Sequence, residues 1–220
     1  MPPVAVLLDL YDTLVRSDWE EMRDLMADRL SIDARVLHDA FDATRPARSI
    51  GRYEDVEGDM AAVIEATGLP ADDETVRDLA SLEFEFLVDH VRLHDDALPV
   101  IRECRSRGVR SVLVSNCSHS TRAVVERLGL LDELDAAVLS YEVRARKPQP
   151  EIYLAALERA GDVTPAQALF VDDQRRYCDG AAALGIDTRL IVRPGEVPME
   201  GVASATNRHR VIASLRELLD

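Results

Sequence analysis

Val4-Ala-Val-Leu-Leu-Asp9-Leu-Tyr-Asp-Thr-Leu14 is the stretch that decides the fold of this chain. It begins with a continuous apolar run, and such a run is typical of a strand buried on both faces of a parallel sheet. An acid, Asp9, follows the run at once. Because ligands bind beyond the carboxyl ends of the strands in open α/β sheets, Asp9 and the residues after it are the first candidates for a functional site.

The rest of the chain repeats this apolar pattern, and helical patterns lie between the repeats. Further buried strands are predicted at residues 111–114, 136–139, 168–171 and 188–192. Helices are predicted at 95–107, 119–128, 149–160, 176–184 and 208–219. Glycines stand where four of these helices should stop, at Gly108, Gly129, Gly161 and Gly185. The alternation of strand and helix predicts an α/β fold with a doubly wound, Rossmann-like parallel sheet.

Residues 17–92 interrupt the alternation, because they contain helical patterns and no convincing strand. The helices are predicted around residues 17–30, 33–43, 53–67 and 72–91, with breaks at Thr44-Arg-Pro46 and Gly68-Leu-Pro70. We therefore expect two units: a core formed by residues 1–16 and 93–220, and an inserted all-α helical bundle formed by residues 17–92.

The composition restricts the classes of ligand. Of 220 residues, 47% are hydrophobic and 30% are charged, which is the balance of an ordinary folded protein. The formal net charge of −15 repels a polyanion, so we expect no nucleic-acid partner. An acidic protein that binds a phosphate must concentrate positive charge locally, from a metal ion, a lysine or a helix N-terminus.

The cysteines and the first residues indicate a cytoplasmic protein. Three cysteines at wide spacings, Cys104, Cys117 and Cys178, suit free thiols in a reducing compartment better than a disulfide framework. The apolar run that ends at Asp9 is too short for a signal peptide or a membrane span. We expect a small-molecule substrate and no membrane partner, and the sequence leaves both a monomer and a homodimer open.

Reactive side chains gather at the predicted strand ends: Asp9 with Tyr11, Asp12 and Thr13; Ser115 with Asn116; Lys147; and Asp172 with Asp173. Together they supply a carboxylate nucleophile, further carboxylates, a hydroxyl and an ammonium group. Oxygen-rich clusters of this kind suit Mg²⁺, which uses few carboxylates and keeps waters or phosphate oxygens as its other ligands. The cation and Lys147 would also shield Asp9 as it approaches a phosphate dianion.

Four of these segments, in order, resemble the motifs of the haloacid dehalogenase superfamily. They are Leu-Leu-Asp9-Leu-Tyr-Asp-Thr13-Leu, Val-Ser115-Asn, Arg-Lys147-Pro and Phe-Val-Asp172-Asp173. The helical insertion resembles the first-position cap of that superfamily. The resemblance implies a Mg²⁺-dependent hydrolase that cleaves the phosphate monoester of a small metabolite through an aspartyl-phosphate intermediate.

The same resemblance implies a role for each residue. Asp9 is the nucleophile, Ser115 donates a hydrogen bond to the transferring phosphoryl group, Lys147 steadies Asp9 and the phosphate, Thr13 orients the loop, and Asn116 joins Ser115 in binding the substrate. Mg²⁺ would be held by Asp9, Asp172, Asp173 and the backbone carbonyl of Tyr11. The alternatives without function are a turn at Asp9 or at Asp172-Asp173, a helix cap at Ser115-Asn116, and a solvated Lys147.

Tyr11 departs from the resemblance, because phosphatases of the superfamily usually place there a second aspartate that protonates the leaving oxygen. A phenol is a poor base near neutral pH. The superfamily's L-2-haloacid dehalogenases carry tyrosine at this position and use no metal, so a dehalogenase that uses Asp9 on a C–X bond is an alternative. Asp172-Asp173 favours the phosphatase, because two adjacent carboxylates beside Asp9 repel one another without a cation.

Asp12 and Tyr177 also affect the predicted activity. Asp12 could replace the missing acid, although neighbouring residues of an extended segment face opposite ways. Tyr177 stands where the superfamily usually has Asn or Asp, which would weaken the outer shell of the metal. Tyr11 and Tyr177 together favour a non-catalytic ligand-binding protein of this fold, and a phosphomutase-like transferase is the last interpretation that the sequence leaves open.

The insertion contributes candidate substrate-binding residues. Arg45, Arg48 and Arg52 follow the predicted helix break, in the part of the cap that faces the active site in the superfamily. A guanidinium there could bind a carboxylate or a second phosphate of the substrate. We select Arg45 and Arg48; the alternative is a solvated helix face.

Overall fold

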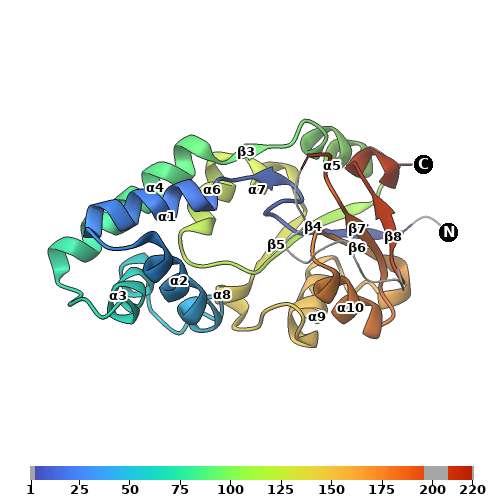
Figure 1. Ribbon diagram of the computed structural model, residues 1–220. Helices are drawn as coiled ribbons and strands as arrows, with labels where there is room; N and C mark the ends of the chain where they lie inside the picture. The colour runs from blue at the N-terminus through green and yellow to red at the C-terminus, as the bar shows by residue number, and fades with distance from the viewer. Residues whose placement is uncertain (1–2, 196–207, 220) are drawn as a thin grey trace.

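The computed structural model describes residues 3–195 and 208–219, and its centre is a six-stranded parallel sheet (Figure 1). Across the sheet the strands run in the order β5-β4-β1-β6-β7-β8. They span Ala136–Leu139 (β5), Arg110–Ser115 (β4), Ala5–Leu8 (β1), Ala168–Asp172 (β6), Asp187–Ile191 (β7) and Arg210–Ile212 (β8). The parallel sheet with helices on both faces confirms the predicted α/β fold.

The strand that precedes the nucleophile candidate, β1, lies in the middle of this sheet. In β1, Leu8 lies opposite Leu113 of β4 on one side and opposite Val171 of β6 on the other. After β1 the chain adds β4 and then β5 on one side of it. The chain then crosses to the other side of β1, where it adds β6. A crevice at such a reversal is where open α/β sheets bind ligands.

Two layers of helices cover the sheet. The helices span Ala97–Ser106 (α5), Thr121–Arg127 (α6), Leu130–Glu133 (α7), Ser140–Val143 (α8), Pro150–Arg159 (α9) and Arg175–Ala183 (α10), with 3₁₀ turns at Pro165–Gln167 (η1) and Leu215–Leu218 (η2). Val6 and Leu8 of β1 face α5, α6, α7 and η2, whereas Ala5 and Leu7 face α9 and α10. This alternation buries β1 on both faces, as its continuous apolar run predicts.

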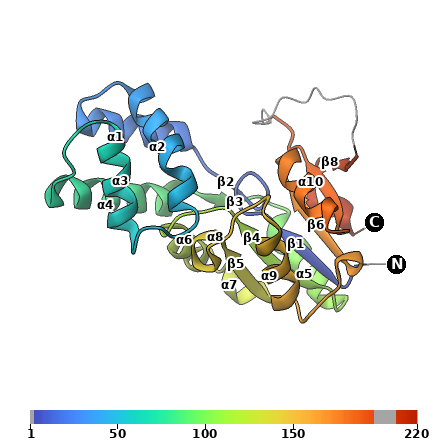
Figure 2. The same cartoon turned by 90° about the horizontal axis from the view of Figure 1, so that it is seen from below.

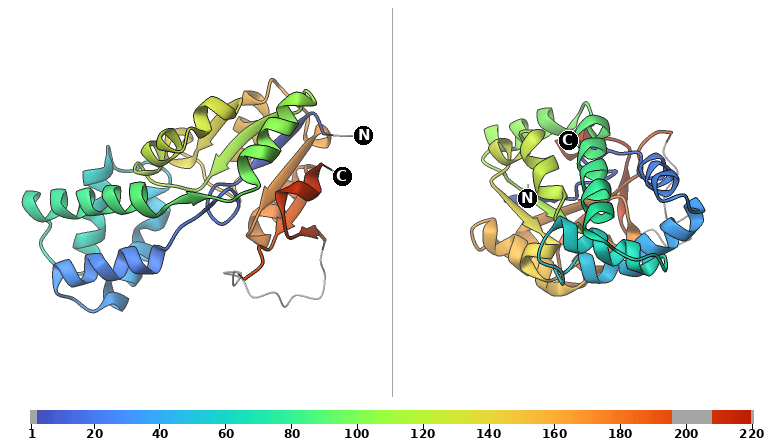
Figure 3. Two further views of the ribbon diagram at one scale, coloured as in Figure 1. Left: turned by 90° about the horizontal axis from the view of Figure 1, so that it is seen from above. Right: turned by 90° about the vertical axis from the view of Figure 1, so that its left-hand side faces the viewer.

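Four helices form the cap, inserted between two short strands. They span Trp19–Leu30 (α1), Ala34–Arg48 (α2), Val56–Ala66 (α3) and Asp73–His90 (α4), and they lie together beyond one end of the core (Figures 2 and 3). The strands Val15–Arg16 (β2) and Arg92–Leu93 (β3) pair antiparallel where the chain leaves the core and returns to it. The apolar interior of the cap, which includes Met26, Leu37 and Leu79, is continuous with the layer over one face of the sheet.

The predicted helix break at Thr44-Arg-Pro46 is wrong, because α2 continues through Pro46 to Arg48. Proline removes one backbone donor and does not by itself end a helix that has other support. The Arg48 guanidinium provides such support: it donates to the carbonyl of Phe41 (3.0 Å) and to the hydroxyl of Thr44 (3.0 Å). These two bonds connect the last turns of α2 across the proline.

The helix predicted at 208–219 is also wrong. The described part of this segment forms β8, which pairs parallel with β7, and the 3₁₀ turn η2. The β-branched Val211 and Ile212 favour a strand, and the open edge of β7 supplies a partner for it. A capping box between Ser214 and Glu217 then begins the turn. Residues 1–2, 196–207 and 220 of the predicted core lie outside the described residues.

Candidate active site

Three adjacent strands place the site residues at one edge of the sheet. Asp9 directly follows β1, and its backbone N–H donates to the carbonyl of Val171 in β6 (3.0 Å). Ser115 is the last residue of β4, and Asp172 is the last residue of β6. Because parallel strands end at the same edge, side chains more than 100 positions apart in the sequence meet there, as predicted.

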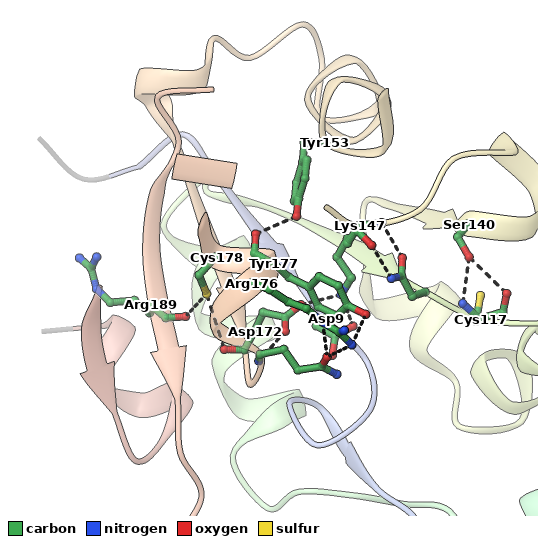
Figure 4. Close-up of polar contacts among 12 residues, drawn as sticks. Asp9, Cys117, Ser140, Lys147, Tyr153, Asp172, Arg176, Tyr177, Cys178 and Arg189 are labelled. Atoms are coloured by element: carbon green, nitrogen blue, oxygen red, sulfur yellow. Dashed lines mark hydrogen bonds and ion pairs between the residues drawn. The ribbon is translucent and has the colours of Figure 1, made fainter. Parts of the chain in front are cut away.

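Lys147 joins two of the carboxylates (Figure 4). Its ammonium nitrogen lies 2.5 Å from Asp9 Oδ1 and 2.6 Å from Asp172 Oδ2, and its side chain is 1% exposed. Burial lowers the pKa of Lys147, but the charges of Asp172 and Asp9 outweigh it and raise the pKa above its ordinary value. The ammonium group is therefore permanently charged near neutral pH. The interpretation of Lys147 as a solvated cation is wrong.

The loop that carries Lys147 is held in place by Asn116. The Asn116 side chain accepts a hydrogen bond from the backbone N–H of Lys147 (2.7 Å) and donates one to its carbonyl (2.9 Å). Both ends of the amide are thus engaged with the backbone of the residue that reaches Asp9. The structure places Asn116 beside the site, and its predicted contact with the substrate stays a prediction.

Asp9, Asp172 and Asp173 form a carboxylate cluster. One oxygen from each lies within 4.8 Å of the others. Burial, followed by the charges of Asp172 and Asp9, raises the pKa of Asp173, and burial together with Asp9 raises that of Asp172 against the opposing charge of Lys147. One ammonium cannot balance three carboxylates, so the cluster disfavours its own ionised form.

This cluster fits a hard divalent cation. All of its donors are carboxylate oxygens, and Asp173 Oδ1 is buried without a hydrogen-bond partner among the described residues. A buried carboxylate oxygen that lacks a donor is costly unless a cation neutralises it. The donor set and the separations suit Mg²⁺.

Two hydroxyl groups at this edge are fully buried. Thr13 and Ser115 each have 0% exposure, and neither hydroxyl has a hydrogen-bond partner within residues 3–195 and 208–219. The backbone carbonyl of Thr13 accepts from the Arg193 guanidinium (2.5 Å), which anchors the loop after β1 to the loop after β7. Both residues are therefore held in place while their hydroxyls keep hydrogen-bonding capacity.

Tyr11 extends from the loop after β1 toward the cap. Its hydroxyl lies 3.1 Å from the hydroxyl of Thr121 at the start of α6, and its ring packs edge-on against Trp19. Burial raises the pKa of the Tyr11 hydroxyl well above its ordinary value of 10, and the negative charges of Glu83 and Asp9 add to the effect. Tyr11 is therefore neutral near pH 7 and cannot act as a base there.

The two cap arginines occupy different environments. Arg45 pairs with Asp42 at 2.5 Å and its side chain is 43% exposed. Arg48 is 8% exposed and lies over the Phe41 ring, 5.0 Å from its centroid. The structure therefore buries Arg48 against other cap residues and leaves Arg45 partly exposed.

Sequence reasoning missed two contributions to the Lys147 environment. The Tyr177 ring centroid lies 5.0 Å from the ammonium nitrogen, and the Phe170 ring centroid lies 5.5 Å from it. Tyr177 is in turn held through its carbonyl, which accepts from the Tyr153 hydroxyl (2.7 Å). The sequence does distinguish Lys147 itself, which is the single lysine among the 26 Lys and Arg residues.

A Rossmann-like core with a helical cap, and an aspartate directly after the central strand, defines the haloacid dehalogenase-like hydrolases. The chain belongs to this family, whose profile matches residues 4–185. It is therefore a hydrolase. Across the described helices, none has both the length and the apolar character that spanning a bilayer requires.

The relatives within the family carry two activities in their names. Phosphatase MT3486 of Mycobacterium tuberculosis (strain CDC 1551 / Oshkosh) is 28% identical over 231 residues, covering 98% of this chain and 96% of the relative. The L-2-haloacid dehalogenase of Xanthobacter autotrophicus has a similar structure, with a TM-score of 0.70, 22% identity and coverage of 98% and 96% of the two chains. A HAD phosphatase from Thermococcus onnurineus aligns with a TM-score of 0.66, 23% identity and coverage of 99% and 96%.

Proposed function

We propose that this protein is a Mg²⁺-dependent phosphatase that hydrolyses the phosphate monoester of a small metabolite. The observation that carries the proposal is the cluster of Asp9, Asp172 and Asp173, in which the Lys147 ammonium contacts Asp9 and Asp172 while one oxygen of Asp173 is buried without a partner among the described residues. A metal-independent enzyme has no use for the unpartnered oxygen of Asp173, whereas a cation turns it into a ligand. The 28% identity to a protein named as a phosphatase, over nearly the whole chain, supports the same conclusion.

The proposed reaction has two steps. A carboxylate oxygen of Asp9 forms a bond to phosphorus while the bond from phosphorus to the leaving oxygen breaks, which yields an aspartyl phosphate and an alkoxide that takes a proton from water and leaves as an alcohol. Water then attacks phosphorus, the bond to Asp9 breaks, and inorganic phosphate leaves. Lys147 would hold Asp9 and offset the charge of the phosphoryl group, and the buried Ser115 hydroxyl, which has no partner among the described residues, would donate to it.

Mg²⁺ would be held by Asp9, Asp172, Asp173 and the backbone carbonyl of Tyr11, and when bound it supplies the positive charge that the cluster lacks. Thr13 orients the loop after β1. Residues 1–16 with 93–220 would be the catalytic unit and residues 17–92 the cap over it. In the cap, the buried Arg48 rather than the partly exposed Arg45 would bind the substrate, together with Asn116 and Ser115 of the core.

The setting of the enzyme is also a proposal. Cys104, Cys117 and Cys178 are buried free thiols, which suits the reducing cytoplasm. The strongly acidic chain supports a small-molecule substrate and not a nucleic acid. The protein would act as a monomer or a homodimer.

A second candidate is metal-independent hydrolysis of a carbon–halogen bond by Asp9. Tyr11 favours it, because a halide leaving group needs no proton and the raised pKa of the tyrosine makes it a poor acid as well as a poor base. Lys147 would hold Asp9 equally well for attack on carbon.

One assay separates the two candidates. Purified protein is tested against a panel of phosphate esters and 2-haloacids, with Mg²⁺ and with EDTA, and inorganic phosphate and halide are measured. The phosphatase predicts phosphate release that EDTA stops and no halide release. Halide release that EDTA leaves unchanged would replace the first candidate with the second, and binding without turnover would indicate a ligand-binding protein.

A further inference from the structure

The chain crosses between core and cap twice, and one buried arginine contacts the core at both crossings. Thr13 lies shortly before β2, where the chain leaves the core, and Asp96 lies shortly after β3, where it returns. Arg193, which follows β7, donates through Nη2 to the carbonyl of Thr13 (2.5 Å) and through Nη1 to Asp96 Oδ2 (2.9 Å). Because a guanidinium group is planar and rigid, these two bonds fix the spacing of the two crossings.

Asp96 is itself held by the core. Its Oδ2 also accepts from the Ser214 hydroxyl (2.6 Å) and from the backbone N–H of Leu215 (2.8 Å), both at the start of η2. Arg193 is 8% exposed and Asp96 is 5% exposed. Burial raises the pKa of Asp96, but hydrogen bonds from Arg193, Ser214 and Leu215 outweigh it and hold the pKa below its ordinary value. A buried, ionised pair therefore connects the loop after β1 to the turn after β8.

Asp96 gives up a local role to make this contact. It stands at the N-cap of α5, where an aspartate usually accepts a backbone N–H of the first turn, but its side chain makes no such bond. A cap of this kind contributes about 1 kcal/mol. A buried ion pair often stabilises a fold no more than apolar residues of similar volume would, so stability alone does not explain the arrangement. What a buried pair can supply is one defined geometry.

The geometry that the pair defines is that of the loop after β1. The Leu10 carbonyl accepts from the backbone N–H of Leu14 (2.8 Å), which closes a turn around Thr13. Leu10 directly follows Asp9 in the sequence. The position at which Arg193 holds Thr13 is therefore transmitted, through one closed turn, to the residue next to the proposed nucleophile.

We propose that Arg193 is a positioning residue for the phosphatase reaction: by holding Thr13 against Asp96 it keeps Asp9 aligned for attack on phosphorus. The inference rests on the proposed function. Arg193 acts through the backbone of the loop and takes no part in breaking or forming bonds. In-line attack requires the reacting atoms to meet at a defined distance and angle, and a displacement of about 1 Å can lower a rate by about 100-fold. Removal of Arg193 should therefore lower kcat and leave substrate binding unchanged.

A cavity beside Arg193 makes chemical rescue possible. The cavity has a volume of about 420 Å³, and Arg193 and Asp96 both line it. Arg16 and Arg216, which are exposed, line it as well, so the cavity reaches the surface. Once the Arg193 side chain is removed, a guanidinium ion from solution can enter and bind between Asp96 and the carbonyl of Thr13.

The first test uses Arg193→Ala with 4-nitrophenyl phosphate as the substrate and Mg²⁺ present. The value of kcat should fall by about 100-fold while KM changes little. Millimolar guanidinium should then raise kcat by about tenfold, because it restores charge-assisted hydrogen bonds to both acceptors. Urea has a similar shape and no charge, so it should not raise kcat, and neither compound should activate the unaltered enzyme.

Arg189 provides the matched control. It lies on β7 and donates to Asp187 Oδ2 (2.9 Å) and to the backbone carbonyl of Thr188 (2.8 Å). It therefore makes the same two kinds of bond as Arg193, but to residues of its own strand. Arg189→Ala should leave kcat and KM unchanged, and guanidinium should not change its kcat.

A double variant separates positioning from stability. Arg193→Ala leaves Asp96 buried without its cation, which can destabilise the protein or prevent folding. Arg193→Met combined with Asp96→Asn removes both charges, and the asparagine oxygen can still accept from Ser214 and Leu215. This double variant should melt close to the temperature of the unaltered protein, but its kcat should stay about 100-fold low. A kcat that recovers together with the melting temperature would show a purely structural role and overturn the inference.

The outcomes also distinguish the inference from the function on which it rests. The inference alone is overturned if Arg193→Ala keeps the kcat of the unaltered enzyme, if only its KM rises, or if guanidinium restores kcat no better than urea. If the unaltered enzyme releases no phosphate from 4-nitrophenyl phosphate or from any other ester, the proposed function fails and the inference fails with it.

Discussion

The cap and the core use their carboxylates in opposite ways. Each cap helix begins with an aspartate whose side chain accepts a backbone N–H of the first turn: Asp18, Asp33, Asp55 and Asp72. The core helices α5, α6, α9 and α10 have no side-chain cap of this kind. In the core the carboxylates that matter are instead buried at the strand ends.

This difference indicates a division of labour. Capping aspartates stabilise short helices that have no sheet to support them, so the cap obtains order from local bonds. The core is stabilised by β1 and the neighbouring strands. It can therefore hold three carboxylates of like charge close together, those of Asp9, Asp172 and Asp173. Next to that cluster lies the N-terminus of α10, and a helix N-terminus favours negative charge nearby. Substitutions in the two regions should therefore have different consequences.

The largest expected effect is on catalysis in the core. Asp9→Asn removes the nucleophile and leaves the cap helices unchanged, so phosphate release should decrease by at least about 10⁴-fold while the circular dichroism spectrum stays the same. Phosphate release is measured with Mg²⁺ present and with one phosphate ester at a saturating concentration. Turnover that survives the substitution would remove Asp9 from its role.

The next effect is on stability, at Lys147. Lys147→Met leaves Asp9 and Asp172 buried without their cation, and breaking a buried pair from one side costs about 3–5 kcal/mol. Urea unfolding of EDTA-treated protein measures this change. The matched control is Arg107→Met, which removes an exposed cation 2.8 Å from Glu103 and should cost less than about 1 kcal/mol. Similar losses in the two variants would contradict the account of the buried cluster.

Much of the core was predictable because its signals are local. The apolar run before Asp9 contains its own evidence for a doubly buried strand, and a parallel sheet places all strand ends at one edge. The four motifs therefore specify the meeting of Asp9, Lys147 and Asp172 without knowledge of any distance. The end of the chain was mispredicted, because Val211 and Ile212 become a strand only when the edge of β7 is available.

The side-chain contacts of the cap could not be predicted in the same way. Asp59 lies within an acidic helical segment, and the sequence does not show that this position faces His119 rather than solvent. Pro46 indicated a break because proline removes a donor, whereas the bonds of Arg48 to Phe41 and Thr44 depend on a side-chain conformation. Contacts between separately folded surfaces follow from packing and not from a local pattern.

A smaller effect links the cluster to pH and Mg²⁺. The pKa values of Asp172 and Asp173 are raised in the folded protein, so above pH 4 the folded state holds more protons than the unfolded state. The unfolding free energy of EDTA-treated protein should therefore decrease as the pH rises from about 5 to 8. Mg²⁺ binds the ionised cluster, so its stabilising effect should increase over the same range and reach about 2.7 kcal/mol at 100 times its Kd.

Melting temperatures with and without Mg²⁺ at several pH values measure this effect. In Asp173→Asn the dependence on pH and the gain from Mg²⁺ should both decrease, because the carboxylate with the unpartnered oxygen is gone. A melting temperature that Mg²⁺ leaves unchanged at pH 8 would count against the metal site.

The smallest effect belongs to the cap. Asp55→Ala removes the acceptor of the Gly58 N–H (2.8 Å) at the start of α3, which should lower the unfolding free energy by about 1 kcal/mol. Asp59 lies on the same helix and contacts His119 of the core, so a frayed α3 would also loosen this contact between cap and core. If the N-terminal aspartates of its helices stabilise the cap domain, Asp55→Ala should raise KM more than it lowers kcat, because the substitution does not touch the nucleophile site. A fall in kcat with KM unchanged would show that the cap and the core are not separable in this way.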